Sequence, residues 1–139
     1  LEAGHPNRIA PGKRPFHTLT PVLVTDDDGR LEMTIGTPGG HGQTPIVLQV
    51  LNNIYLFGMS PQEAVEAPRY LSHDGLRVSI EDRVPASALR GLSAYGHELD
   101  IVSGWTAPFG GAQVIQVIGS PAVLRTGADP RREAYALAF

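Results

Sequence analysis

The chain has 139 residues, a net charge of −3 and no cysteine. Hydrophobic residues make up 42% and charged residues 18%, which is the composition of a folded domain and argues against disorder. Without cysteine the chain has no disulfide, no thiol nucleophile and no Cys-ligated zinc, and it suits either redox compartment, so localisation stays open. No basic stripe supports binding to nucleic acid. The longest apolar stretch, residues 45–59, is interrupted by polar side chains and is too short for a membrane span.

The first half of the chain predicts an extended leader, two strands and a helix. Residues 1–15 are rich in proline, which disfavours a helix there. Strands are expected at 20–25 and 31–35, joined by an Asp-Gly turn at 26–30 whose three consecutive aspartates lack the alternate spacing of an EF-hand. After a Gly-rich segment, Thr44 is expected to cap a helix that begins at Pro45 and is stopped by Gly58.

The second half predicts shorter elements. Ser60 and Glu63 have the spacing of a capping box for a helix that ends near Ala67, before Pro68. A third helix is expected at 85–95, and strands are expected at 76–80, 98–102, 112–118 and 121–125. Short links between neighbouring strands favour antiparallel pairing. We therefore expect one segment, residues 1–139, with an α+β fold built on a mostly antiparallel sheet with packed helices.

The Gly-rich segment at 36–45 is a candidate site. It lacks the lysine of a Walker loop and the spacing of a dinucleotide fingerprint. Gly39 and Gly40 have no Cβ, so their consecutive backbone N–H groups can face one negatively polarised oxygen, as in an oxyanion hole. The alternative is a turn that binds nothing. The five histidines have no close-set metal-ligand spacing, so no metal and no cofactor is predicted.

Several motifs together resemble the γ-glutamyltranspeptidase family of N-terminal-nucleophile hydrolases. They are G-K-R-P with the following L-T-P in residues 11–21, G-T-P-G-G at 36–40, two helix segments at 48–59 and 62–69, G-G-A-Q at 110–113 and G-A-D-P-R-R at 127–132. The motifs occur in the family's order and cover nearly the whole chain. The resemblance implies the C-terminal part of a small subunit, within a sandwich of αββα type.

The resemblance also implies an activity and partners. Family members hydrolyse or transfer γ-glutamyl, or related acyl, amides such as glutathione. Their precursor cuts itself, and the new N-terminal threonine is the nucleophile. That threonine would precede this chain, which does not begin with Met, so we expect a fragment that is inactive alone. The expected partners are the rest of the small subunit, the large subunit and a small amide substrate; self-association through an uncovered sheet edge is also expected.

The resemblance assigns four site residues. Gly39 and Gly40 match the glycines of the family's oxyanion hole, while His17 and Thr18 match two serines that hold the substrate's α-carboxylate. Thr18 keeps the hydroxyl, but His17 is larger and ionisable. This departure leaves open an amidohydrolase or acylase that acts on non-glutamyl amides, and a structural hydrogen-bonding role for His17. A free-standing anion-binding module is the alternative from another class.

Three further features favour structural roles. The tail at 129–132 is expected to form an ion-paired turn. Trp105 and Phe109 flank a loop rich in Gly and Pro and are candidates for a pocket wall. Ordinary core packing is the favoured interpretation of both aromatic residues.

Overall fold

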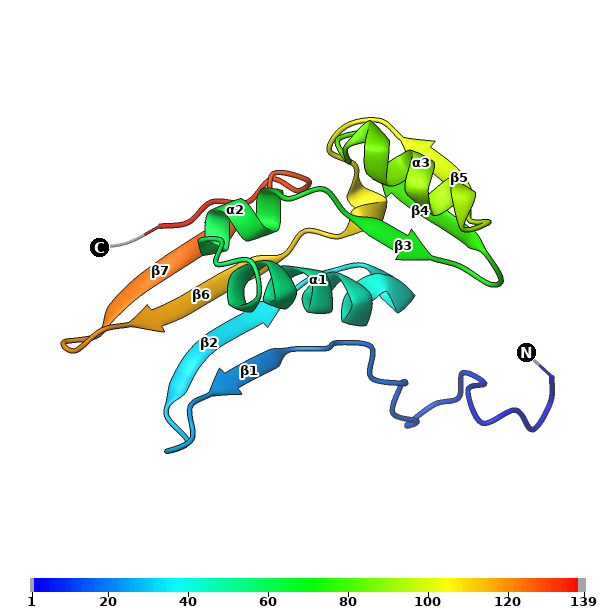
Figure 1. Ribbon diagram of the computed structural model, residues 1–139. Coiled ribbons are helices and arrows are strands. Elements are labelled where there is room, and N and C mark those ends of the chain that lie inside the picture. Colours follow the sequence, from blue (N-terminus) through cyan, green and yellow to red (C-terminus); the bar gives the residue numbers. More distant parts are fainter. Residues whose placement is uncertain (1, 138–139) are drawn as a thin grey trace.

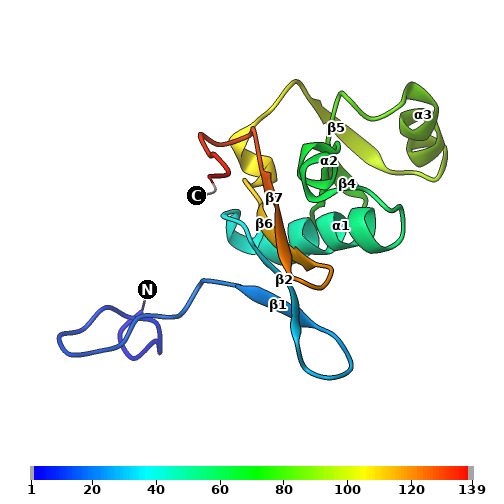
Figure 2. The same cartoon turned by 90° about the vertical axis from the view of Figure 1, so that its left-hand side faces the viewer.

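A computed structural model of the chain describes residues 2–137 and has an α+β fold (Figure 1). Its larger sheet has four strands in the order β1-β2-β6-β7, and every neighbouring pair is antiparallel. The strands are β1 (Val22–Thr25), β2 (Leu31–Gly36), β6 (Gln113–Ile118) and β7 (Val123–Ala128). Helices α1 (Gln43–Tyr55) and α2 (Pro61–Glu66) lie on the same side of this sheet (Figure 2).

A smaller sheet has three strands in the order β3-β4-β5. Its elements are β3 (Tyr70–Ser72), β4 (Arg77–Glu81), α3 (Ala86–Ala94) and β5 (Glu98–Val102). Strands β4 and β5 are parallel, unlike the other pairs in the described residues. The prediction of a mostly antiparallel fold is confirmed, and the parallel pair is possible because α3 provides the crossover that parallel strands need. Strand β3 was not predicted; it is short and forms by pairing with β4.

The core lies between the four-stranded sheet and the two helices. Alternate residues of β2, Met33 and Ile35, face Val47, Val50 and Ile54 of α1, as the periods of strand and helix require. The cluster is completed by Ala64 and Val65 of α2, by Val114 of β6, and by Ala112, which directly precedes β6. Burial of these side chains holds the Gly-rich segment between β2 and α1 in place, because both of its neighbours belong to the core.

The first helix begins differently from the prediction. A single turn of 3-10 helix, η1 (Gly40–Gly42), precedes α1, so the helix starts at Gln43 and Gly42 is its cap residue. Thr44 is therefore already inside the helix and does not cap it, which corrects the predicted start. The hydrogen bond from the N–H of Gly42 to the carbonyl of Gly39, at 2.8 Å, closes this turn.

The second helix confirms its predicted capping box. The Ser60 hydroxyl accepts a hydrogen bond from the N–H of Glu63, whose carboxylate accepts one from the N–H of Ser60 at 2.8 Å. The backbone bond stabilises the charged carboxylate and lowers the pKa of Glu63. Two predicted strands were displaced by more than one residue, whereas the other predicted strand bounds hold to within one. Strand β1 begins at Val22 and not at residue 20. Strand β7 is Val123–Ala128 and not 121–125, because it pairs with β6 along its full length.

The leader is extended, as predicted, and all described residues from 2 to 20 are exposed. Figure 2 shows this segment projecting away from the packed elements. Among residues 2–137, no helix combines the length and apolar character needed to cross a membrane.

Helix α2 packs so closely on β7 that Gly127 has no room for a side chain. A Cβ there would lie 2.5 Å from the carbonyl oxygen of Pro61. We expect Gly127→Ala to destabilise the protein by about 1–3 kcal/mol, because the backbone of α2 must move. Gly91→Ala is the matched control: it has open space within α3, so a gain of about 0.5–1 kcal/mol is expected. Urea unfolding that gave equal effects for both variants would contradict this packing.

Candidate functional site

The backbone amides of Gly39 and Gly40 are unpaired in the described residues. Strand pairing ends at Gly36, and neither amide donates to a backbone or side-chain acceptor within residues 2–137. Their φ values, 153° and 54°, lie in the region that favours glycine. Gly39 is half-buried and Gly40 is exposed. Two adjacent N–H groups therefore remain available for an external acceptor, as an oxyanion hole requires.

Thr37 anchors the loop to the segment that precedes the neighbouring strand β6. Its hydroxyl donates to the carbonyl of Pro38 at 2.7 Å and accepts from the N–H of Gly111 at 3.0 Å. Gly110 packs against the same hydroxyl so closely that a Cβ on it would lie 2.6 Å from Thr37 Oγ1. These contacts hold the loop against the segment that precedes β6, and this restricts the orientation of the Gly39 and Gly40 amides.

The leader lies beside this loop at Thr18. The Gln43 side-chain amide, at the start of α1, donates to the carbonyl of Thr18 at 3.0 Å. An open pocket of about 310 Å³, here called the leader pocket, lies between the two segments. Its walls are residues 19–21 of the leader, residues 36–38 of the loop, and Gln43. Of the four predicted site residues, the structure thus brings Thr18 close to the segment that carries Gly39 and Gly40.

His17 lies next to Thr18 in the exposed leader. Within residues 2–137 its side chain forms no hydrogen bond and no ion pair, so the contacts of the chain do not support a structural hydrogen-bonding role. It is also absent from the walls of the leader pocket. His17 therefore lies beside Thr18 in the leader, with an imidazole that is bonded to no residue from 2 to 137.

A second open pocket lies between the residue that follows the glycine pair and the turn between β3 and β4. It has a volume of about 570 Å³, and we call it the hairpin pocket because the turn between β3 and β4 forms most of its wall. The wall residues in and beside this turn are Ser72, His73, Asp74 and Arg77. His41, the residue after Gly40, completes the wall. Figure 1 shows the start of α1 and this turn at the same end of the molecule. No group of three or more possible metal ligands occurs in the described residues.

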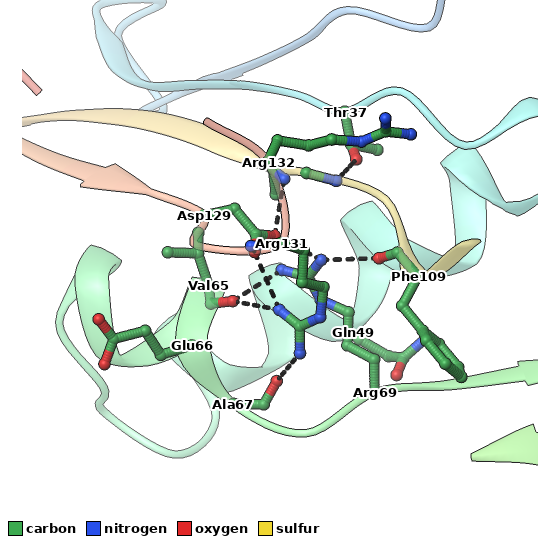
Figure 3. Close-up of polar contacts among 12 residues, drawn as sticks. Thr37, Gln49, Val65, Glu66, Ala67, Arg69, Phe109, Asp129, Arg131 and Arg132 are labelled. Carbon is green, nitrogen blue, oxygen red and sulfur yellow. Dashed lines mark hydrogen bonds and ion pairs between the residues drawn. The ribbon is translucent and has the colours of Figure 1, made fainter. Parts of the chain in front are cut away.

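Four buried charged residues, here called the buried network, hold the two sheets together, and Figure 3 labels Arg69, Asp129 and Arg131 among them. They are Arg69, Glu81, Asp129 and Arg131, each at most 5% exposed. Arg131 donates to both oxygens of Glu81, at 2.6 and 2.7 Å, and Arg69 contacts Asp129 at 2.6 Å. Asp129 and Arg131 also pair at 3.1 Å, which confirms the ion-paired turn predicted for the tail. Arg132 lies outside the buried network and is exposed.

The buried network also satisfies backbone groups at the end of α2. Arg131 donates to the carbonyls of Val65 and Ala67, both at 2.8 Å, and Arg69 donates to the carbonyl of Val65 at 3.0 Å (Figure 3). Burial, followed by repulsion from Arg131, lowers the pKa of Arg69, while Asp129 opposes this shift. The sequence did not reveal the roles of Arg69 and Glu81, because their partners lie far along the chain. For Glu81 the available signal was a charged residue directly after the strand expected at 76–80.

The two aromatic residues have different environments. Phe109, in the 3-10 turn η2 (Ala107–Phe109), is 1% exposed, and its carbonyl accepts from Arg69 at 2.8 Å, so packing is its role. Trp105 is partly exposed and stacks under the guanidinium of Arg83, 3.6 Å from the ring centroid. It also lines an open pocket of about 550 Å³ with Phe57 and Glu66. The pocket interpretation therefore holds for Trp105 and the packing interpretation for Phe109.

Comparison with solved structures shows that the chain shares its fold with γ-glutamyltranspeptidases. The chain superposes on a γ-glutamyltranspeptidase from Pseudomonas nitroreducens with a TM-score of 0.78 and 29% identity, covering 100% of this chain and 71% of that one. The family model described as gamma-glutamyltranspeptidase matches residues 1–139. The chain belongs to the γ-glutamyltranspeptidase family, as its motifs indicated.

Curated relatives point to more than one activity within this family. The chain is 33% identical to the glutathione hydrolase-like YwrD proenzyme of Bacillus subtilis over 99% of its length. It is 32% identical to the oxamate amidohydrolase proenzyme of Klebsiella pneumoniae over 100% of its length. In both cases it spans 27% of the relative, so it corresponds to about a quarter of those proenzymes.

Proposed function

We propose that this chain is part of an enzyme that cleaves γ-glutamyl, or related acyl, amides and supplies its oxyanion hole. The observation that carries the proposal is the pair of unpaired amides at Gly39 and Gly40, on a loop anchored through Thr37. Attack on an amide carbonyl places negative charge on its oxygen. Two N–H donors already oriented toward that oxygen stabilise the charge as it develops, without reorganisation of solvent.

Thr18 is the proposed contact for a carboxylate on the acyl side of the substrate, with His17 beside it. The support is the position of Thr18 next to the leader pocket. Pro38 lines this pocket and directly precedes Gly39. A hydroxyl donor at this position orients an acyl chain whose carbonyl reaches the glycine amides. Thr18 and Thr20 lie inside the chain and have no free α-amine. We therefore assign the nucleophile to an N-terminal threonine supplied by the parent protein.

The proposed partners are the rest of the small subunit, the large subunit and a small amide substrate. Leu23 of β1 and Leu124 of β7, which are 69% and 64% exposed, lie on the two edge strands of the larger sheet and are available to pack against another part of the parent protein. A second sheet on this face would complete the αββα sandwich and remove these apolar groups from water. A second copy of the chain would cover the same groups in the isolated fragment.

A second candidate function is amide hydrolysis with an acyl group other than γ-glutamyl. The observation that favours it is His17, which stands where a small hydroxyl residue would hold the γ-glutamyl α-carboxylate. The relative from Klebsiella pneumoniae, named an oxamate amidohydrolase, shows that the family includes such a protein. A bulkier, ionisable side chain changes both the space and the charge beside Thr18.

The test is release of alanine by the full-length protein from three substrates that share this leaving group. They are γ-glutamyl-alanine, N-glutaryl-alanine, which lacks the α-amine, and N-oxalyl-alanine. We expect turnover of at least one, with γ-glutamyl-alanine favoured by the leading proposal and N-oxalyl-alanine by the second. Release from none of them, by a protein that binds anions, would contradict an enzyme and support the free-standing binding module.

A further inference from the structure

Each of the two glycine amides belongs to a peptide unit whose carbonyl group is hydrogen-bonded. A trans peptide unit is planar, so its N–H and C=O groups point in opposite directions. The N–H of Gly39 shares a unit with the carbonyl of Pro38, and the N–H of Gly40 shares one with the carbonyl of Gly39. Both of these peptide bonds are trans. A hydrogen bond that fixes either carbonyl therefore also fixes the direction of the amide in the same unit.

The two carbonyls are held by different kinds of group. The Gly39 carbonyl accepts from the N–H of Gly42 at 2.8 Å, a bond between two backbone groups. The Pro38 carbonyl accepts from the Thr37 hydroxyl at 2.7 Å, and no backbone N–H in residues 2–137 donates to it. The direction of the Gly40 amide thus follows from the backbone of the 3-10 turn, whereas the direction of the Gly39 amide depends on one side chain.

The Thr37 hydroxyl uses its donor and its acceptor at the same time. Its single proton goes to the carbonyl of Pro38, and its oxygen accepts from the N–H of Gly111 at 3.0 Å, the bond drawn in Figure 3. Gly110 packs against the same carbonyl, because a Cβ there would lie 2.9 Å from the Pro38 oxygen. The Pro38 carbonyl therefore faces the segment that precedes β6, and the Gly39 N–H points away from that segment.

The segment that receives Thr37 is fixed by the buried network. The carbonyl of Phe109 accepts from the Arg69 guanidinium at 2.8 Å, and the N–H of Ala112 donates to Asp129 Oδ2 at 2.9 Å. Both charged side chains are at most 1% exposed. The N–H that the Thr37 hydroxyl accepts from lies between these two anchored positions, so the hydroxyl has a rigid reference point.

We propose that Thr37 is a positioning residue for the Gly39 amide. Its hydroxyl holds the Pro38 carbonyl, so the N–H on the opposite side of the same peptide unit stays directed at the reacting oxygen. Without this bond the unit can rotate, and rotation replaces an N–H donor with a carbonyl oxygen that repels the developing negative charge. This inference rests on the proposed function, and it adds a residue that acts through the oxyanion hole without touching the substrate.

The test is Thr37→Val in the full-length protein, with Thr37→Ser as the conservative variant. Valine has a similar shape but neither donates nor accepts a hydrogen bond. We expect kcat for the best of the three alanine-releasing substrates to fall about 10–100-fold, less than the loss of a whole oxyanion donor. KM should change little, because the donor acts mainly in the transition state. Thr37→Ser keeps the hydroxyl and should recover most of the kcat.

Inhibition by a boronate analogue of the same acyl group gives a second readout. The boronate becomes tetrahedral when a nucleophile attacks it, so it engages the oxyanion donors as the transition state does. Its inhibition constant should rise in Thr37→Val by a factor similar to the fall in kcat/KM. A merely structural role would reduce the amount of folded enzyme and leave the inhibition constant and KM of the folded part unchanged.

Thr34→Val is the matched control for this substitution. Thr34 lies on β2, is half-buried like Thr37, and its hydroxyl forms no hydrogen bond with any residue from 2 to 137. It should leave kcat within about twofold of the original. If Thr37→Val does not fold, Thr37→Ala takes its place and is compared with Thr37→Ser, because these two variants differ by a single oxygen atom.

The outcomes distinguish this inference from the proposed function. A kcat in Thr37→Val close to the original, or no recovery in Thr37→Ser, would overturn the role of Thr37 and leave the proposed enzyme intact. Failure of both the valine and the alanine variants to fold, with a folded serine variant, would make the hydroxyl structural and would also overturn it. Absence of turnover of all three substrates by the unchanged protein would overturn the proposed function, and this inference with it.

Discussion

Replacement of Gly40 by valine is expected to lower the kcat of the full-length enzyme by about 10²–10³-fold, the loss typical of one oxyanion donor. The φ of 54° at Gly40 suits glycine and is unfavourable for a β-branched residue. The loop must therefore rotate, which turns the amide away from the substrate. Space is not the reason, because a Cβ at Gly40 would have no atom within 4 Å. Turnover of the alanine-releasing substrate measures the effect.

Gly29→Val is the matched control for this substitution. Gly29 also has a positive φ, 79°, and open space around it, but it lies in the turn between β1 and β2, away from both pockets. It should reduce stability by a similar amount and leave kcat within about twofold of the original. If Gly40→Val retained near-normal kcat, or if both variants lost activity equally, the assignment of Gly40 to the oxyanion hole would be wrong.

Arg131→Met is expected to destabilise the protein by about 3–5 kcal/mol, the effect of breaking a buried ion pair by removing one partner. Arg131 pairs with both Glu81 and Asp129, and it donates to two carbonyls at the end of α2. Methionine keeps much of the volume but removes the hydrogen-bond donor to Glu81 Oε1 and to the carbonyl of Ala67, which no other residue from 2 to 137 replaces. Urea unfolding of the full-length protein gives the change in free energy.

Arg30→Met is the control that separates burial from charge. Arg30 pairs with Asp28 at 2.7 Å, but its side chain is 76% exposed, so its loss should change stability by less than about 1 kcal/mol. An effect of Arg131→Met no larger than that of Arg30→Met would mean that the buried network does not hold the two sheets together.

Much of the local structure could be predicted from the sequence because its causes are local. The capping box at Ser60 and Glu63 and the apolar period of α1 each depend on residues a few positions apart. Thr44 shows the limit even there. Thr44 is a good cap residue, but Gly39 and Gly42 close a 3-10 turn first and move the start of α1 earlier.

The parallel pair and the buried network could not be predicted in this way. The pairing of β4 with β5 depends on how α3 packs, and the contact of Glu81 with Arg131 joins residues 50 positions apart. The candidate site lies between these cases. The Gly39–Gly40 motif was visible in the sequence, but the pocket that Arg77 shares with His41 exists only because the β3–β4 turn folds back to the start of α1.

The proposed oxyanion hole requires that the amides of Gly39 and Gly40 hold the oxygen of a reacting carbonyl. A crystal structure of the full-length protein with a boronate or phosphonate analogue of its best acyl substrate tests this most directly. We expect one oxygen of the analogue about 2.7–3.1 Å from both glycine nitrogens, the distance that oxyanion donors require. An inhibitor bound at the nucleophile with its oxygens facing other donors, and with both glycine amides bonded only to water, would contradict the account.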